Sequence, residues 1–382
     1  MNRVLRNERG IALAVANFAL VVVGALVAGA LFAGMQEQRM GENSRRLQQS
    51  FAVAEAGAFE VVRNWDPGAI NSVPPYPGGS FSVALTTVGT KTGSYGGVVY
   101  KMNDNIYLVD ITGSDTMSRA GRIPGGGARQ RIGLVARIRP MKVDVQASLT
   151  TRGAVTLKGN AFVDGNDHTP NTTWGSCGLP GPAVAGIRTA DPAVSGAAGR
   201  VTGSPPILVD ATVTPATFAQ FGDVSWEELA SRANITLPGG VLRTQPVVSG
   251  ATCTKSVLTN WGDGINRNSP CGNYFPIVHL TGDATLNGVQ GQGILLVDGD
   301  LSVQGGYEFF GIAIIRGRLK TEGGGTTEAH FWGGVMAENV DLELNNLSGN
   351  ATLNYSKCTI LQALQMTGVV SPLRSRSWVQ LF

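Results

Sequence analysis

Histidine is scarce in this 382-residue sequence, with three copies at His168, His279 and His330. They are widely separated, and no C-x-x-C or H-x-x-x-H spacing occurs. Zinc sites and His-based triads depend on such residues. The sequence therefore leaves little for either kind of site. Because it also contains no nucleophile–base signature, we expect no enzyme activity, no cofactor and no metal.

Charge is also sparse, at 15% of residues, and the formal net charge is +3. Arg3, Arg6 and Arg9 together with Glu8 supply +2 of this within the first ten residues. The remainder is close to neutral, whereas nucleic-acid-binding surfaces carry an excess of Lys and Arg. We therefore expect no nucleic-acid partner.

Only four cysteines occur, and all follow the apolar run near the N-terminus: Cys177, Cys253, Cys271 and Cys358. An even number without zinc spacing suits two disulfides in an oxidising compartment. Cys253 and Cys271 flank a single loop, which one disulfide would close, and Cys177 would then pair with Cys358. Four cysteines permit three connectivities, so this pairing is a hypothesis.

An apolar run without charge extends from Ile11 to Met35, and Asn17 is its only polar residue. Such a run is long enough to cross a bilayer as a helix, whereas the apolar part of a secretory signal is about half as long and ends in a cleavage site. Arginines precede the run, so the positive-inside rule leaves the N-terminus in the cytoplasm and the rest outside.

Small residues recur within the run at a spacing of four, in the pairs Gly24/Ala28, Ala25/Gly29 and Ala30/Gly34. Such residues let other helices approach closely. They are also common in any membrane helix, so both interpretations stay open.

The helix is predicted to continue well beyond the apolar run, because no proline occurs before Pro67. An amphipathic stripe with helical period follows, formed by Leu47, Phe51, Ala54, Ala58 and Val61. One helix over residues 11–65 would be about 80 Å long. Its second half has one apolar face to lay against a globular domain.

The segments RNERGIAL and GENSRRLQQSFAVAEAGAFE, with the apolar run between them, resemble the N-terminus of PilX-type minor pilins of type IV pili. That pattern is a basic leader ending in glycine, an apolar stretch and an Asn/Arg/Gln-rich stretch that closes on A-x-x-AEAG. The resemblance covers about the first 65 residues. It implies that residues 1–10 are a prepilin leader, that prepilin peptidase cuts between Gly10 and Ile11, and that the new amine of Ile11 is methylated.

The same resemblance implies where the protein is found and what it binds. It places the subunit in the bacterial inner membrane as a single-pass protein with its C-terminal region in the periplasm or exterior, and later in a pilus filament or at the cell surface. The implied partners are other pilins and minor pilins, the inner-membrane pilus assembly platform and, before assembly, the lipid bilayer. The filament-core helix would include Val15, Asn17, Gly24, Ala28 and Gly29.

Two residues depart from the pattern of major pilins. The first mature residue is Ile11 instead of phenylalanine, and the fifth is Val15, where major subunits carry a glutamate that is thought to pair with the N-terminal amine of a neighbour. Tip subunits of type II secretion pseudopili are similar in lacking this glutamate. The departure suggests a tip position, and the alternative is drift in a low-abundance subunit.

The chain beyond the helix is rich in strand-like runs and turns, which predicts an α+β, mainly β protein. Residues 66–143 alternate apolar and polar residues between turns and are predicted to form a pilin-like antiparallel sheet. Residues 103–105 are predicted to turn a hairpin within it. The apolar C-terminus around Trp378 is predicted to be a last strand packed on the body.

Residues 144–382 are predicted to form a β-solenoid-like ectodomain. Apolar triplets follow Gly293, Gly311 and Gly334, and this period of about 20 residues is typical of stacked parallel rungs. A loop-rich insertion is expected at about 166–275, with one short helix that begins in the capping box Ser225 to Glu228. An ordinary β-sandwich is the alternative.

Four acidic turn residues are the best candidates for binding a calcium ion: Asp164, Asp167, Asp298 and Asp300. Asp-Gly pairs also supply turn geometry between strands, which is the interpretation that we favour.

The leading hypothesis is a minor pilin-like structural subunit of a type IV pilus or a type II secretion pseudopilus, with its ectodomain at the tip. One alternative is a single-pass anchored adhesin or carbohydrate-active protein that retains its leader. Its polysaccharide groove would use aromatic residues such as Tyr307, Phe309, Phe310 and Trp332, although packing in the core is the simpler role for them. A cytoplasmic β-helical scaffold of the bactofilin sort is disfavoured by the apolar run and the cysteines.

Overall fold

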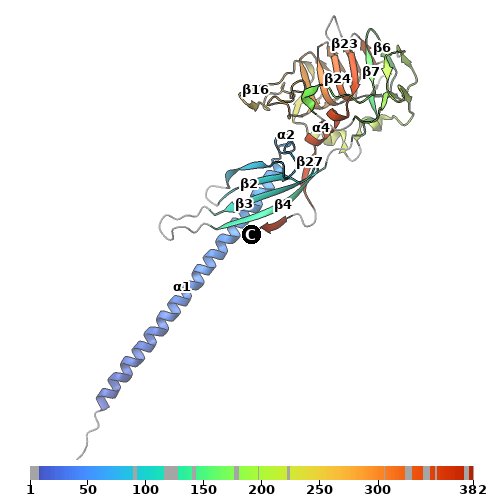
Figure 1. Cartoon of the computed structure of the whole chain (residues 1–382). Coiled ribbons are helices and arrows are strands. Elements are labelled where there is room, and N and C mark those ends of the chain that lie inside the picture. The colour runs from blue at the N-terminus through green and yellow to red at the C-terminus, as the bar shows by residue number, and fades with distance from the viewer. Residues whose placement is uncertain are drawn as a thin grey trace, which may run out of the picture.

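The protein consists of a long helix, an antiparallel sheet against the second half of that helix, and a parallel-stranded body beyond the sheet (Figure 1). This is the predicted α+β, mainly β fold. The computed structural model describes residues 8–88, 93–115, 128–139, 143–175, 180–196, 198–221, 224–304, 306–322, 329–338, 345–348, 351–373 and 378–381.

Helix α1 (Glu8–Arg63) is continuous over 56 residues, so the prediction of one helix over 11–65 is confirmed. It ends where Pro67 restricts the preceding residues to extended backbone. Asp66 then caps the short helix α2 (Pro67–Ile70) by accepting the Ala69 N–H at 3.3 Å. Figure 1 shows the first half of α1 projecting away from the rest of the molecule.

Sheet A is an antiparallel meander followed by two strands from the C-terminus. The predicted hairpin is present between β2 and β3, where Asn103 Oδ1 accepts the N–H groups of Asn105 and Ile106 at 2.9 Å each. The meander strands are β1 (Phe81–Val88), β2 (Gly93–Lys101), β3 (Ile106–Ser114) and β4 (Arg129–Arg139).

The second half of α1 docks on sheet A through small side chains. Of the predicted stripe, Ala54 and Ala58 are buried, and Phe51 and Val61 are partly buried in the same cluster. Leu47 is 43% exposed, because the helix reaches the sheet only after this residue. Gly57 permits the close approach, since a Cβ atom there would lie 2.4 Å from Tyr95 Cγ.

The parallel-stranded body has two facing sheets, B and C, and the chain alternates between them. All strand pairs in these two sheets within the described ranges are parallel, unlike the antiparallel pairs of a β-sandwich. Their inward side chains form one apolar core. The central strands, alternating between sheets B and C, are β18 (Ile277–Leu280), β19 (Ala284–Leu286), β20 (Gln290–Val297), β21 (Leu301–Gln304), β22 (Glu308–Ile315), β23 (Leu319–Glu322), β24 (Ala329–Ala337) and β25 (Asn345–Ser348).

The predicted apolar triplets lie in register, with Leu295 opposite Ala313 and Ala313 opposite Val335. The start of the third repeat at Gly334 is wrong by one residue, because Gly311 pairs with Gly333. We call Gly293, Gly311 and Gly333 the glycine column. All three have positive φ, and a Cβ atom on Gly311 would lie 2.0 Å from the Gly293 carbonyl oxygen. Only glycine allows the successive strands to stack at this point.

The strands of the parallel-stranded body are not stacked in the order of the sequence. The chain enters at β5, runs outward through β8 and β11, and restarts at the opposite end with β14 and β15. The segment 166–275, predicted to be loop-rich, therefore contributes short strands to both sheets. The further strands of the body are β5 (Ala147–Thr151), β6 (Val155–Leu157), β7 (Phe162–Asp164), β8 (Ala185–Thr189), β9 (Val194–Ser195), β10 (Val201–Thr202), β11 (Ile207–Val209), β14 (Ile235–Leu237), β15 (Gly240–Leu242) and β26 (Ala351–Tyr355).

Short helices and two small hairpins cover this body. The predicted helix after Ser225 is α3, whose Glu228 N–H is accepted by the Ser225 hydroxyl at 3.2 Å. The small elements are η1 (Thr172–Trp174), η2 (Pro215–Phe218), β12 (Gln220–Phe221), β13 (Val224–Ser225), α3 (Trp226–Ser231), β16 (Val248–Ser249) and β17 (Thr252–Cys253).

The C-terminal segment returns to sheet A. Helix α4 (Lys357–Met366) covers sheet B, and β27 (Val369–Pro372) and β28 (Trp378–Leu381) then pair antiparallel with β4. The body is thus inserted between strands of sheet A, whereas the predicted ectodomain 144–382 included these last strands. Without β27 and β28, the outer edge of β4 would carry unpaired backbone N–H and C=O groups. Such an edge can pair with strands of other chains and lead to aggregation.

The predicted disulfide between Cys253 and Cys271 is present and closes a loop with a sequence separation of 18. Cys358 is also in a disulfide, and no described cysteine is free. Its predicted partner Cys177 lies outside the described residues, so that pairing stays a prediction.

Removing the Cys253–Cys271 disulfide is expected to destabilise the body. Replacing both cysteines by alanine restores the chain entropy of the open loop in the unfolded state, which costs about 3 kcal/mol of unfolding free energy. Denaturant titration of the full chain, followed by tryptophan fluorescence, measures this loss. Ser256→Ala, at an exposed position of the same loop, is the control and should change stability little. Equal midpoints for the double variant and the wild type would contradict the prediction.

Candidate functional site

The apolar half of α1 is exposed from residue 12 onward. Every side chain from residue 12 to residue 45 is exposed, with Phe18 at 71% and Leu26 at 69%. By length and composition this is a helix that can cross a membrane, with a mean hydropathy of 2.4 over its best window. Exposed apolar area is unfavourable in water by about 25 cal/mol per Å². This half of the helix therefore needs lipid or other helices around it.

The predicted processing residues lie at the start of this helix. Gly10 and Ile11 are in the third and fourth positions of α1, which begins at Glu8. Cleavage between them would leave an essentially intact helix. Val15 follows one turn later and is 61% exposed. The first acidic residue after it is Glu37, so residues 11–36 contain no carboxylate to offer a neighbouring amine.

The predicted filament-core residues have open space around them in the single chain. Asn17 and Ala28 are exposed. A Cβ atom built on Gly24, Gly29 or Gly34 would meet nothing within 4 Å. Because their side chains are small or absent, these positions allow the backbone of another helix to approach closely.

The acidic turn residues are engaged by protein groups. Asp298 accepts from His279 at 2.9 Å, and Asp300 pairs with Arg318 at 2.7 Å. Asp167 accepts the N–H groups of Gly181 and Lys357 at 2.6 and 2.8 Å. Within the described part of the chain, no three or more His, Cys, Asp and Glu side chains gather as metal ligands would.

Asp164 has a similar structural role. Burial alone would raise the pKa of this carboxyl group, but hydrogen bonds from Thr202, Asn166 and His168 lower it below its usual value. The Thr202 hydroxyl lies 2.6 Å away and His168 Nε2 lies 2.8 Å away. These contacts tie neighbouring turns of the body together.

The aromatic residues that the adhesin alternative would use are in the core. Tyr307, Phe309 and Phe310 are at most 1% exposed, and Trp332 is partly buried. Burial raises the pKa of the Tyr307 hydroxyl above its usual range. A sugar ring has no access to the three buried side chains, so they do not line a polysaccharide groove.

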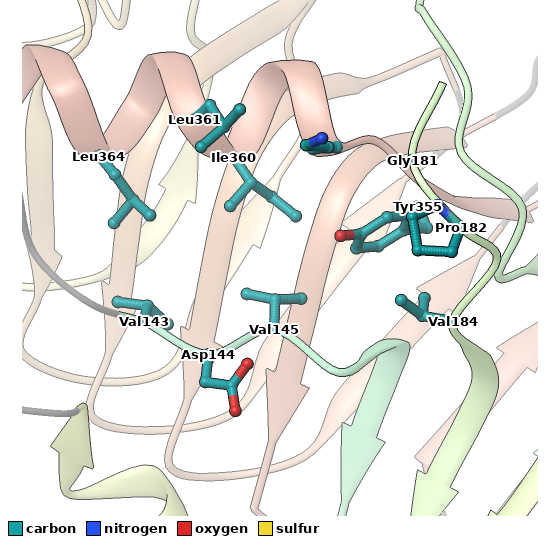
Figure 2. A pocket seen from close by; sticks show the side chains of 11 residues that line it. Val143, Asp144, Val145, Gly181, Pro182, Val184, Tyr355, Ile360, Leu361 and Leu364 are labelled. Carbon is teal, nitrogen blue, oxygen red and sulfur yellow. The ribbon is translucent and has the colours of Figure 1, made fainter. Parts of the chain in front are cut away.

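An apolar hollow of about 300 Å³ lies between α4 and the segment before β5 (Figure 2). Ile360 and Leu364 face Val143 and Val145 across it, with Tyr355 at one end, while Asp144 points away from it. Burial raises the pKa of Tyr355, and the charges of Asp167 and Asp144 raise it further. Besides hydrocarbon and one phenol, the residues that line this hollow include Lys357 and Asp144.

A second, polar hollow of about 470 Å³ lies where α2 and the β2–β3 turn meet α4 and the disulfide-closed loop. Arg267 lies in its wall. Arg267 has no local signal in the sequence, because the side chains that surround it come from segments far apart in the chain.

No family model matches the sequence, and no curated protein matches it. Among solved structures, the chain is similar to the competence-associated pilin ComZ from Thermus thermophilus, with a TM-score of 0.26 and 12% identity over 88% of this chain and 97% of that chain.

Proposed function

We propose that this chain is a minor pilin-like, non-enzymatic structural subunit whose apolar helix moves from the lipid bilayer into a filament core of similar helices. One observation carries the proposal. A single unbroken helix has a fully exposed, uncharged half and a second half docked on an antiparallel sheet. A plain membrane anchor needs no rigid continuation into a folded domain.

The energetics of this transfer favour coupling to assembly. Leaving the bilayer costs about 0.8 kcal/mol for each methylene group that becomes exposed to water. Helices of neighbouring subunits would cover the same surface, and Gly24, Ala28 and Gly29 are open positions at which they can approach. The partners under this proposal are other pilins, prepilin peptidase and the inner-membrane assembly platform.

The proposal extends to a position at the filament tip. Two features support it: Val15 offers no carboxylate to a neighbour, and the parallel-stranded body lies at the far end from the apolar half of the helix (Figure 1). A tip subunit has no subunit above it, so a body in that position would obstruct no contact. The filament is a type IV pilus or a type II secretion pseudopilus.

The variant Gly10→Glu is expected to block processing. In the wild type, intact-mass analysis of the native protein should give a chain that starts at N-methylated Ile11. The variant should retain residues 1–10, because glutamate replaces the glycine at which the peptidase cuts.

Gly41→Glu is the matched control, since Gly41 is an exposed glycine of the same helix with nothing within 4 Å of a Cβ atom. It should be processed like the wild type. A wild-type protein that keeps Met1, or that loses the whole helix, would refute the proposed function.

A further inference from the structure

Arg267 is held between two aromatic rings in the loop that the Cys253–Cys271 disulfide closes. Its guanidinium carbon lies 4.6 Å from the ring centroid of Trp174 and 4.6 Å from that of Phe275. Cation–π contacts of this kind hold a guanidinium group in a fixed place. The charge is therefore positioned, not free to move through solvent.

This partly buried cation forms no ion pair with an acidic side chain among the described residues. Arg267 Nη1 is buried and makes no hydrogen bond there, and Nη2 makes one long contact, 3.4 Å to Gln362 Oε1. Asp263 is the nearby acid, but its Oδ1 atom already accepts from Asn266 N–H and Gln290 Nε2. Burial lowers the pKa of Arg267 to about 10, although the charge of Asp263 opposes the change. A buried donor without an acceptor is costly.

The polar hollow lies beside this cation and draws its wall from two parts of the molecule. Lys101 ends β2 and Asp104 lies in the β2–β3 turn, whereas Asn273 follows the disulfide-closed loop and Gln362 and Gln365 lie in α4. Lys101 Nζ donates to the Asn71 carbonyl oxygen at 3.1 Å and lies 3.3 Å from Asp104 Oδ1. The ionised wall groups (Arg267, Lys101 and Asp104) leave one net positive charge.

The chemistry of the wall selects among possible ligands. One net positive charge matches one carboxylate, whereas a phosphate group carries closer to two negative charges. Carboxamide groups both donate and accept, which suits hydroxyl groups. A neutral sugar usually needs an aromatic platform, but the Trp174 ring is already stacked on Phe310 and covered by Arg267. A volume of about 470 Å³ is within the range for small-molecule sites.

We propose that this hollow binds a small hydroxylated carboxylate of the sugar-acid class. The carboxylate pairs with the guanidinium group of Arg267 at Nη2, whose contact with Gln362 Oε1 is long at 3.4 Å, and the hydroxyl groups bind the carboxamides of Asn273, Gln362 and Gln365. Because the wall comes from sheet A and from the parallel-stranded body, the bound ligand bridges the two. This inference does not depend on the proposed role of α1.

Isothermal titration of the full-length protein in a non-ionic detergent tests the site, with galacturonate as the probe. Galactose is the matched neutral sugar, and inorganic phosphate is the comparison anion. We expect saturable binding of galacturonate, with galactose and phosphate each at least about tenfold weaker because each lacks one half of the recognised chemistry.

Two isosteric variants at exposed positions should shift the affinity in opposite directions. Asn273→Asp adds a carboxylate to the wall and should weaken galacturonate binding about tenfold. Asp104→Asn removes one and should strengthen binding several-fold, and its side chain is 67% exposed, so the fold tolerates the change. Arg267→Met should abolish binding, with the circular dichroism spectrum of the wild type as the check on folding.

The proposal fails if galacturonate gives no saturable heat, or if galactose or phosphate binds equally well. It also fails if the affinities of Asn273→Asp and Asp104→Asn equal that of the wild type. Tight binding of an acidic peptide without galacturonate binding would assign the hollow to a protein partner and overturn the sugar-acid assignment.

Discussion

Replacing Gly311 by alanine is expected to unfold the parallel-stranded body, at a cost of about 4 kcal/mol or more in unfolding free energy. Gly311 has a φ of +138°, which L-residues rarely adopt, and a Cβ atom would lie 2.0 Å from the Gly293 carbonyl oxygen. That oxygen belongs to the backbone of the adjacent strand and cannot move without breaking the pairing of β20 with β22. The clash therefore separates two strands in the middle of sheet B.

The measurement is a denaturant titration of the full chain, followed by the fluorescence of the buried tryptophans of the body, Trp174, Trp226 and Trp261. Gly199→Ala is the control, because Gly199 also has positive φ, +69°, but has nothing within 4 Å of a Cβ atom. Its backbone cost should be about 1 kcal/mol. Equal losses for the two variants would show that the stacking at Gly311 is not what limits stability.

The second large effect is expected from Gly57→Val, at the contact between α1 and sheet A. A Cβ atom at this position would lie 2.4 Å from Tyr95 Cγ. Tyr95 is only 6% exposed, so the surrounding side chains prevent its ring from moving aside. Overpacking of this kind costs about 3 kcal/mol. The helix should then separate from the sheet, while the parallel-stranded body stays folded.

Hydrogen exchange of the full chain in detergent distinguishes these regions. We expect faster exchange of the amides of β2 and β3 in Gly57→Val and unchanged exchange in β20 and β22. Ala56→Val is the matched control, because Ala56 is the preceding residue on the exposed side of the same helix. Valine there should cost about 0.5 kcal/mol through helix propensity. Indistinguishable exchange for the two variants would contradict the close contact at Gly57.

The features that could be predicted are those with a local signal. The extent of α1 follows from an uncharged run, a helical stripe and the position of Pro67. The β2–β3 hairpin follows from Asn103, whose side chain makes its own turn hydrogen bonds. The exposure of Val15 and Gly24 follows from composition, because no polar face exists on that half of the helix.

The features that escaped prediction depend on contacts between distant segments. Nothing near Val370 indicates that it pairs with Ile138 in β4, so the return of the chain to sheet A was missed. The register of the third repeat was misplaced by one residue because Gly333 and Gly334 are adjacent and only the strand pairing distinguishes them. Arg267 lacks a local signal for the same reason, since Trp174 is far away in the sequence.

The insertion of the body into sheet A has a mechanical consequence. The chain leaves for the body from the end of β4 and returns from it directly into β27, its hydrogen-bonded neighbour. Tension applied to the body therefore enters the sheet along β4, whose pairing with β3 spans nine residue pairs from Ile106–Arg137 to Ser114–Arg129. A body attached through two adjacent strands resists mechanical separation from sheet A and α1.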